Sequence, residues 1–164
     1  MKSLLVFVLA LVFMIPLART AFAAPSRDVF HGQPTRLLFK GDFEADEAYS
    51  KVSPTLYVTA NGSGQSTELG PFTVSYHTEV NLHDFSEAET VNFAGTNGDS
   101  LQAKGVGQSI EDRTPEMYNV VQIYTITGGS GQFAGASGTF TLKRLVSRKV
   151  GMANSTFEGY ILLP

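Results

Sequence analysis

The sequence predicts an all-β protein of about eight antiparallel strands, arranged as an up-and-down barrel or as a sandwich. Gly, Ser and Thr supply 43 of the 141 residues that follow Ala23. No stretch of a dozen residues shows the apolar spacing of an amphipathic helix, whereas several short segments alternate apolar and polar side chains. Turn residues separate these segments at nearly regular intervals. A barrel is favoured because it leaves no strand edge exposed.

The first 23 residues are predicted to be a signal peptide. Residues 4–17 form a run of 14 residues that are apolar except for Pro16, which is short for a membrane span of about 20. Ala21 and Ala23 place small residues at the −3 and −1 positions of a signal peptidase site. We expect cleavage after Ala23, a secreted or periplasmic protein, and no transmembrane segment in the mature form; an uncleaved anchor is the alternative.

The remaining chain has the composition of one soluble domain. Without Lys2 and Arg19 the net charge moves from −3 to −5, so a basic face for nucleic acid is not expected. The sequence has no cysteine, which excludes disulfides and thiolate metal sites. We expect no cofactor, a flexible N-terminal arm at residues 24–36 and a single barrel domain at residues 37–164.

The clearest strand is expected at residues 72–82, where apolar side chains occupy every second position. Asn97-Gly98 between two strand-like runs is a strong hairpin signal. Residues 118–127 are apolar on both faces, which indicates a central strand or a subunit contact. In chain order, the eight expected strands are residues 37–44, 55–60, 72–82, 90–94, 100–110, 118–127, 139–146 and 156–163.

A glycine cluster follows the sixth expected strand. It contains Gly-x-Gly-x-x-Ala at residues 129–134, formally a dinucleotide-binding motif, but that motif requires a helix to follow. The next residues, 138–143, alternate like a strand instead. We therefore expect a corner between two strands with Phe133 as its anchor. The residues assigned to this structural corner are Gly128, Gly129, Gly131, Phe133, Gly135 and Gly138.

The segment ITGGSGQFAGASGTFTLK, residues 126–143, resembles the corner of plant allene oxide cyclases and of the related dirigent proteins. Compact bacterial secreted proteins of the same allene oxide cyclase barrel-like superfamily look closer still, through residues 69–73 and the Gly-Asp-Ser-Leu turn at 98–101. The resemblance implies an eight-stranded antiparallel, calycin-like barrel that forms a homo-oligomer, a trimer or a dimer.

The resemblance does not bring the cyclase residues with it. Allene oxide cyclases are said to use a Glu and an Asn near the first strand, a Pro and a Cys, but this chain lacks the Glu-x-Asn pair and has no cysteine. Dirigent-type catalysis asks for acidic groups at the mouth of the lumen. Asp42 or Glu44 could play that part here. The resemblance therefore assigns no catalytic residues, and these stay unknown.

Three other patterns favour ordinary surface roles. His77, Glu79, Asn81 and His83 lie near one another on a strand, but the two histidines are too far apart to share an ion, so we expect no metal site. The basic residues at positions 143, 144, 148 and 149 predict a solvated hairpin. The alternative is contact with an anionic surface or with the acidic stretch Glu111-Asp112 of a neighbouring subunit. Asn61 and Asn154 are glycosylation acceptors if the host glycosylates.

The predicted function is non-enzymatic binding of a small apolar or aromatic ligand in the lumen. One alternative is an isomerase, cyclase or dirigent-type enzyme acting on a hydrophobic substrate. A second is a structural or interaction protein whose barrel is filled by its own side chains. A void of several hundred Å³ would favour binding or catalysis, and a packed lumen the structural alternative. The expected ligand-binding residues are Phe39, Phe43, Leu56, Val58, Phe72, Val74 and Tyr76.

Overall fold

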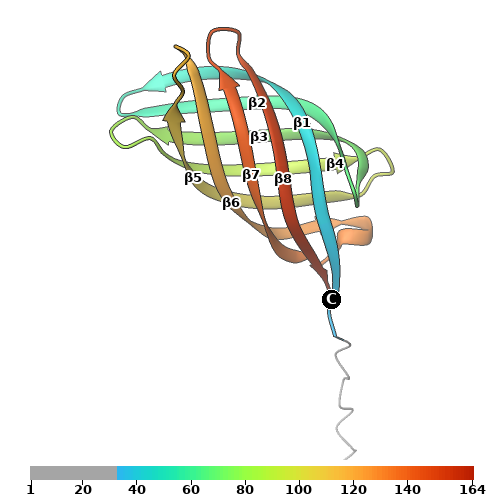
Figure 1. The fold of residues 1–164 in the computed structure, drawn as a ribbon. Helices are drawn as coiled ribbons and strands as arrows, with labels where there is room; N and C mark the ends of the chain where they lie inside the picture. Colours follow the sequence, from blue (N-terminus) through green and yellow to red (C-terminus); the bar gives the residue numbers. More distant parts are fainter. Residues whose placement is uncertain (1–32) are drawn as a thin grey trace, which may run out of the picture. The chain divides into compact units, whose positions relative to one another are not determined.

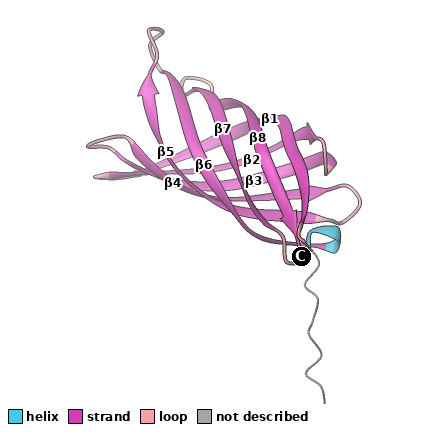
Figure 2. Ribbon diagram, turned by 60° about the horizontal axis from the view of Figure 1, so that its bottom comes forward, coloured by secondary structure: helices cyan, strands magenta, loops and turns pink. Residues whose placement is uncertain are grey.

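A computed structural model describes residues 33–164, so the predicted signal peptide, its cleavage site and residues 24–32 of the predicted arm lie outside the described residues. The described chain is a closed antiparallel barrel in which each strand pairs with the next and β8 pairs with β1 (Figure 1; Figure 2). The all-β, eight-stranded prediction is therefore confirmed. The elements are β1 (Thr35–Val52), β2 (Thr55–Ser66), β3 (Gly70–Asn81), β4 (Ser86–Gly95), β5 (Ser100–Glu111), β6 (Met117–Ser130), η1 (Gly131–Phe133), β7 (Ser137–Ser147) and β8 (Met152–Leu163).

The strands are longer than the sequence pattern predicted, above all at the first hairpin. β1 begins at residue 35, inside the predicted arm, and continues to Val52 rather than ending at residue 44. β2 continues past residue 60 to Ser66. Its added length contains Gly62 and Gly64, where a Cβ atom would collide with the backbone of β1. These glycines are weak strand formers, but here they let the two strands approach closely.

The two ends of the barrel differ. The end that we call the corner end carries the β2–β3, β4–β5 and β6–β7 connections, and η1 lies there beside the C-terminus (Figure 2). The other end, the mouth, carries the β1–β2, β3–β4, β5–β6 and β7–β8 turns. No helix within residues 33–164 is both long and apolar enough to cross a bilayer.

The glycine cluster forms the connection between β6 and β7. Gly131 has a φ of +62°, and a side chain there would also collide with the Asp99 carboxylate. That carboxylate accepts a hydrogen bond from the backbone N–H of Gln132 at 3.0 Å. Phe133 is fully buried and joins the main hydrophobic core. β7 follows the glycines, so the helix that a dinucleotide motif requires is replaced by a strand.

Aromatic rings fill the half of the lumen nearest the corner end. Because side chains alternate between the two faces of a strand, every second side chain points into the barrel. Phe93 has its ring centroid 5.3–6.2 Å from those of five other phenylalanines, in edge-to-face or tilted contacts. Tyr124 stacks on Phe140 at 4.6 Å. Such pairs add about 0.5–1.5 kcal/mol each to the free energy of burial. The packed rings are Phe39, Phe43, Phe72, Phe93, Tyr124, Phe140 and Phe157.

Candidate functional site in the barrel lumen

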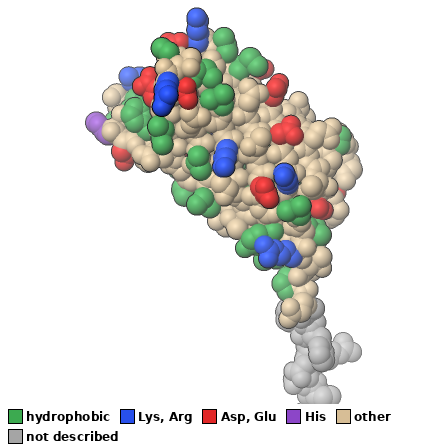
Figure 3. Space-filling view, viewed as in Figure 1, with side chains coloured by type: hydrophobic (Ala, Val, Ile, Leu, Met, Phe, Trp, Pro, Cys, Tyr) green, Lys and Arg blue, Asp and Glu red, His purple; other side chains and the backbone are tan. Residues whose placement is uncertain are grey.

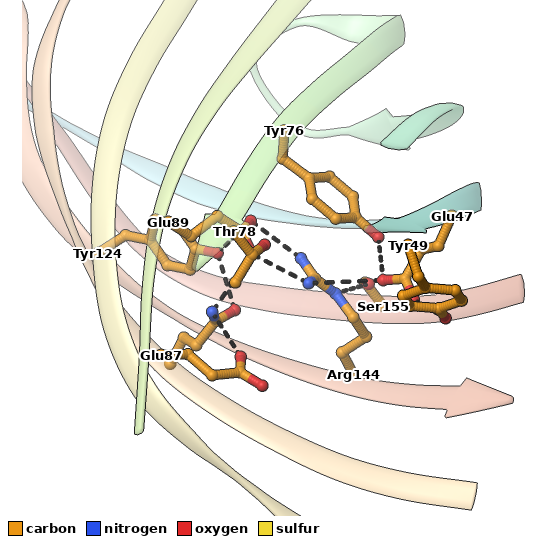
Figure 4. Close-up of polar contacts among 10 residues, drawn as sticks. Glu47, Tyr49, Tyr76, Thr78, Glu87, Glu89, Tyr124, Arg144 and Ser155 are labelled. Carbon is orange, nitrogen blue, oxygen red and sulfur yellow. Dashed lines mark hydrogen bonds and ion pairs between the residues drawn. The ribbon is translucent and has the colours of Figure 1, made fainter. Parts of the chain in front are cut away.

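The half of the lumen nearest the mouth is polar, and its side chains contact one another (Figure 4). They come from six strands, β1, β3, β4, β6, β7 and β8. Buried ionisable groups are costly unless they are paired, so such a cluster needs explanation. We call it the lumen cluster; it consists of Glu47, Tyr49, Tyr76, Thr78, Glu87, Glu89, Gln122, Tyr124, Arg144 and Ser155.

A buried ion pair between β7 and β4 lies at the centre of the lumen cluster. Arg144 donates from Nη1 and Nη2 to the two carboxylate oxygens of Glu89, each at 3.0 Å. Its Nε donates to Ser155 Oγ at 3.2 Å. The two charged side chains are 2% and 0% exposed. Burial opposes ionisation of Glu89, but the guanidinium charge and the hydrogen bonds that the carboxylate accepts together outweigh it and lower the pKa of that carboxyl.

Three neutral donors complete the shell around the Glu89 carboxylate. Tyr124 donates to Oε1 at 2.6 Å, Thr78 donates to Oε2 at 2.7 Å and Gln122 at 3.2 Å. Burial raises the pKa of Tyr124 well above its ordinary value, so it is a donor at all ordinary pH values. Gly105 lies opposite Tyr124 on β5 and leaves the space that the ring occupies, since a Cβ there would lie 2.5 Å from it.

Glu47 forms the second acidic centre of the lumen cluster. Its carboxylate accepts hydrogen bonds from Tyr76 at 2.6 Å and from Tyr49 at 2.5 Å, and burial raises the pKa of both hydroxyls. Arg144 Nη1 is 4.0 Å from Glu47 Oε1, and its guanidinium carbon lies 4.1 Å above the Tyr76 ring. One arginine therefore interacts with two carboxylates and one aromatic face.

Glu87 is the third carboxyl group and differs from the other two. It is 7% exposed, accepts a hydrogen bond from Gln122 Nε2 at 3.0 Å, and forms no ion pair within residues 33–164. Burial raises its pKa to about 7. Ser109 lines the same cavity as Glu87, and its buried Oγ has no hydrogen-bond partner in the described chain.

Little empty space remains in the lumen that residues 33–164 enclose. A cavity of about 20 Å³ lies at the mouth, lined by Glu47, Tyr49, Glu87, Ser109 and Arg144 among others. That volume holds one water molecule. The larger hollows have lining residues that are mostly exposed and lie on the outer surface, as in the hollow of about 480 Å³ across β6, β7, β8 and β1.

The residues predicted to bind a ligand all point into the barrel. Each is between 0% and 8% exposed. Phe39, Phe43 and Phe72 belong to the packed rings, Val58 lines the mouth cavity, and Tyr76 belongs to the lumen cluster. Leu56 and Val74 lie in the same hydrophobic core. Ligand contact with these seven side chains stays a prediction.

The acidic residues proposed for the lumen mouth were chosen wrongly. Asp42 and Glu44 are exposed on the outer surface, because they alternate with the inward Phe43. The carboxyl groups that reach the lumen are Glu47 on the extension of β1, and Glu87 and Glu89 on β4.

The prediction that the basic residues at positions 143, 144, 148 and 149 are solvated was also wrong for one of them. Three of these four residues lie outside the core, but Arg144 is buried at the centre of the lumen cluster. His77 and Glu79 lie on the outer face of β3, and His77 stacks on Tyr57 at 6.1 Å.

A signal for Arg144 was present in the sequence. Phe140, Leu142, Arg144 and Val146 occupy alternate positions of one strand, which places the arginine on the buried face. The same alternation along β4 joins Glu87 and Glu89 to Val91 and Phe93. The sequence does not show which charges meet, since Glu89 and Arg144 are 55 residues apart.

Comparison with known proteins supports the fold. No family model matches the chain, and no curated protein does. Among solved structures, the barrel is similar to the pterocarpan synthase dirigent protein GePTS1, with a TM-score of 0.61 and 14% sequence identity over 88% of this chain and 98% of that one. The fold is therefore a dirigent-like, eight-stranded barrel, as the resemblance of the glycine corner implied. At this identity the similarity concerns the fold alone.

Proposed function

We propose that the protein is an exported, non-enzymatic structural or interaction protein that acts through the outer surface of a filled barrel. The filled lumen is the observation that carries this proposal. Packed rings occupy one half and the lumen cluster the other, leaving about 20 Å³. Pockets for small organic ligands usually enclose about 300–1,000 Å³. A ligand would have to displace side chains that are already paired.

The outer surface offers an apolar area suited to self-association. Figure 3 shows hydrophobic side chains exposed among polar ones on one face of the barrel. Val106 on β5 pairs directly with Ile123 on β6, and the exposed fractions of these residues are 65% and 62%. Exposed apolar patches of this kind mark interaction surfaces. We call this the outer apolar patch; it comprises Val106, Ile110, Val121, Ile123 and Leu145.

Closure of the barrel bears on why β6 carries apolar side chains on both of its faces. A strand with apolar side chains on both faces is either buried on both faces within its own chain or has one face that binds another molecule. In a single closed barrel the outer face of β6 has no second layer over it in residues 33–164, and Val121 and Ile123 are exposed. These observations support a homo-oligomer, a dimer or a trimer, that covers the patch.

Sedimentation of the purified barrel tests this proposal. The wild type is expected to sediment as a dimer or trimer at micromolar concentration, and the variant Val121→Ser/Ile123→Thr as a monomer. Val52→Thr is the matched control, because Val52 is 62% exposed at the end of β1 and outside the patch. A wild type that is monomeric at high concentration would overturn the interaction proposal.

We also propose that the protein reaches the cell exterior or the periplasm through the leader at residues 1–23. The mass of the protein recovered from the medium or periplasm is expected to correspond to a chain that begins at Ala24. Recovery of the full-length chain from the membrane fraction would contradict this.

A second candidate function is dirigent-type or isomerase-like catalysis on a hydrophobic substrate at the mouth. It is favoured by Glu87, whose pKa of about 7 suits a general acid at neutral pH. Small phenols titrated into labelled protein would show saturable NMR shifts at mouth residues, such as Tyr118 and Ser109, if this candidate holds. Absence of saturation at millimolar phenol would favour the structural proposal.

A further inference from the structure

The mouth cavity has an unbalanced set of charges. Three carboxyl groups, those of Glu47, Glu87 and Glu89, belong to the buried lumen cluster, and Arg144 pairs with two of them. Arg148 also lines the cavity, but its guanidinium lies 4.0 Å over the Tyr118 ring. Even if Arg148 is counted, one carboxyl group lacks a basic partner in the described chain. Glu87 is that group.

A second observation at the same place is independent of charge. Ser109 is 4% exposed, it lines the cavity together with Glu87, and its Oγ has no hydrogen-bond partner in the described residues. Buried hydroxyls without a partner are rare, and each calls for an occupant such as a water or an ion. Ser109 and Glu87 face a common space from β5 and β4, so one bound group can satisfy both.

The size of the cavity limits that group to one heavy atom. About 20 Å³ accommodates a water molecule, and ammonium has nearly the same size. A neutral water would satisfy Ser109, but it would leave the ionised form of Glu87 without a counter-charge. A hydrogen-bond-donating monocation satisfies both. It can donate to the carboxylate and to the serine oxygen at once, with charge-assisted bonds.

We propose that the mouth of the barrel is a binding site for an ammonium group, either free ammonium or the head of a primary amine, held by Glu87 and Ser109. The alkyl part of an amine would extend through the mouth past the half-buried side chains of Tyr49 and Tyr118. The site is separate from the outer apolar patch, so its failure would leave the proposed function untouched.

Thermal unfolding in matched chloride salts tests this site. At pH 8, where Glu87 is largely ionised, 100 mM ammonium is expected to raise the unfolding midpoint above that in tetramethylammonium or potassium at equal ionic strength. For a dissociation constant near 10 mM the rise is about 5 °C. The variants Glu87→Gln and Ser109→Ala should lose this difference. Glu79→Gln, which removes an exposed carboxylate on β3, should keep it.

A direct measurement covers the case in which a lumen variant fails to fold. In the wild type, ¹⁵N-ammonium should give a bound resonance with slowed proton exchange, and methylamine should displace it. Equal midpoints in ammonium and tetramethylammonium, equal stabilisation by potassium, or no bound resonance would overturn the proposal and assign the cavity to water.

Discussion

Replacing Arg144 with methionine should destabilise the barrel more than any other loss of a single charge. The guanidinium is 2% exposed and makes two 3.0 Å bonds to Glu89, a 3.2 Å bond to Ser155 and a 4.0 Å contact with Glu47. Without it, two buried carboxyl groups lose their counter-charge. Breaking one partner of a buried pair costs about 3–5 kcal/mol. Tyr124, Thr78 and Gln122 still donate to Glu89, so we expect the lower end of that range.

Urea unfolding at pH 7 measures this cost. Lys143→Met is the matched control, since it removes the same charge from the adjacent exposed position and should cost less than about 0.5 kcal/mol. The double variant Arg144→Met/Glu89→Gln should recover part of the loss, because the uncompensated charge at position 89 is then absent. If Arg144→Met were no more costly than Lys143→Met, the ion pair would not hold the lumen together and our reasoning would be refuted.

Two further predictions concern the other parts of the lumen. The pKa of Glu87 is raised from 4.5 to about 7 in the folded protein, so the folded state binds this proton more tightly than the unfolded chain does. The stability that Glu87 contributes is therefore fully present below about pH 4.5 and is lost as the pH rises to about 7, by up to about 3 kcal/mol. The free energy of unfolding measured against pH should show this decline in the wild type and lack it in Glu87→Gln. A decline that is unchanged in the variant would contradict the assignment. Phe93→Ala should lower the free energy of unfolding in urea by about 3–5 kcal/mol, because Phe93 is fully buried among five other rings. The control Phe85→Ala changes a side chain that is 39% exposed and should cost far less. Equal costs would show that the rings do not form the core.

The fold could be predicted because its signals are local. The alternation along residues 72–82 corresponds to β3, whose inward side chains run from Phe72 to Val80. The glycine cluster marks the place where the chain turns between β6 and β7. A closed barrel of consecutive strands needs only these patterns and short turns, since each strand pairs with its neighbours in the sequence.

The lumen cluster could not be predicted as a whole, because its signals are partly absent and partly non-local. Along the missed part of β1 the inward positions hold Ala45, Glu47 and Tyr49, so the apolar alternation that marks a strand fades. Arg144 stands among other basic residues, and its burial shows only in the alternation of β7. Closure of the barrel then brings it to Glu89 on β4, a contact that no local pattern encodes.

The central claim is that side chains of the protein itself fill the lumen and leave no room inside it for a hydrophobic organic ligand. Native mass spectrometry of the protein purified from its own host tests this claim most directly. We predict a dimer or trimer with no hydrophobic molecule retained in the barrel. A small hydrophobic molecule retained at one copy per chain, and lost on unfolding, would contradict the account and restore ligand binding as the function of the barrel.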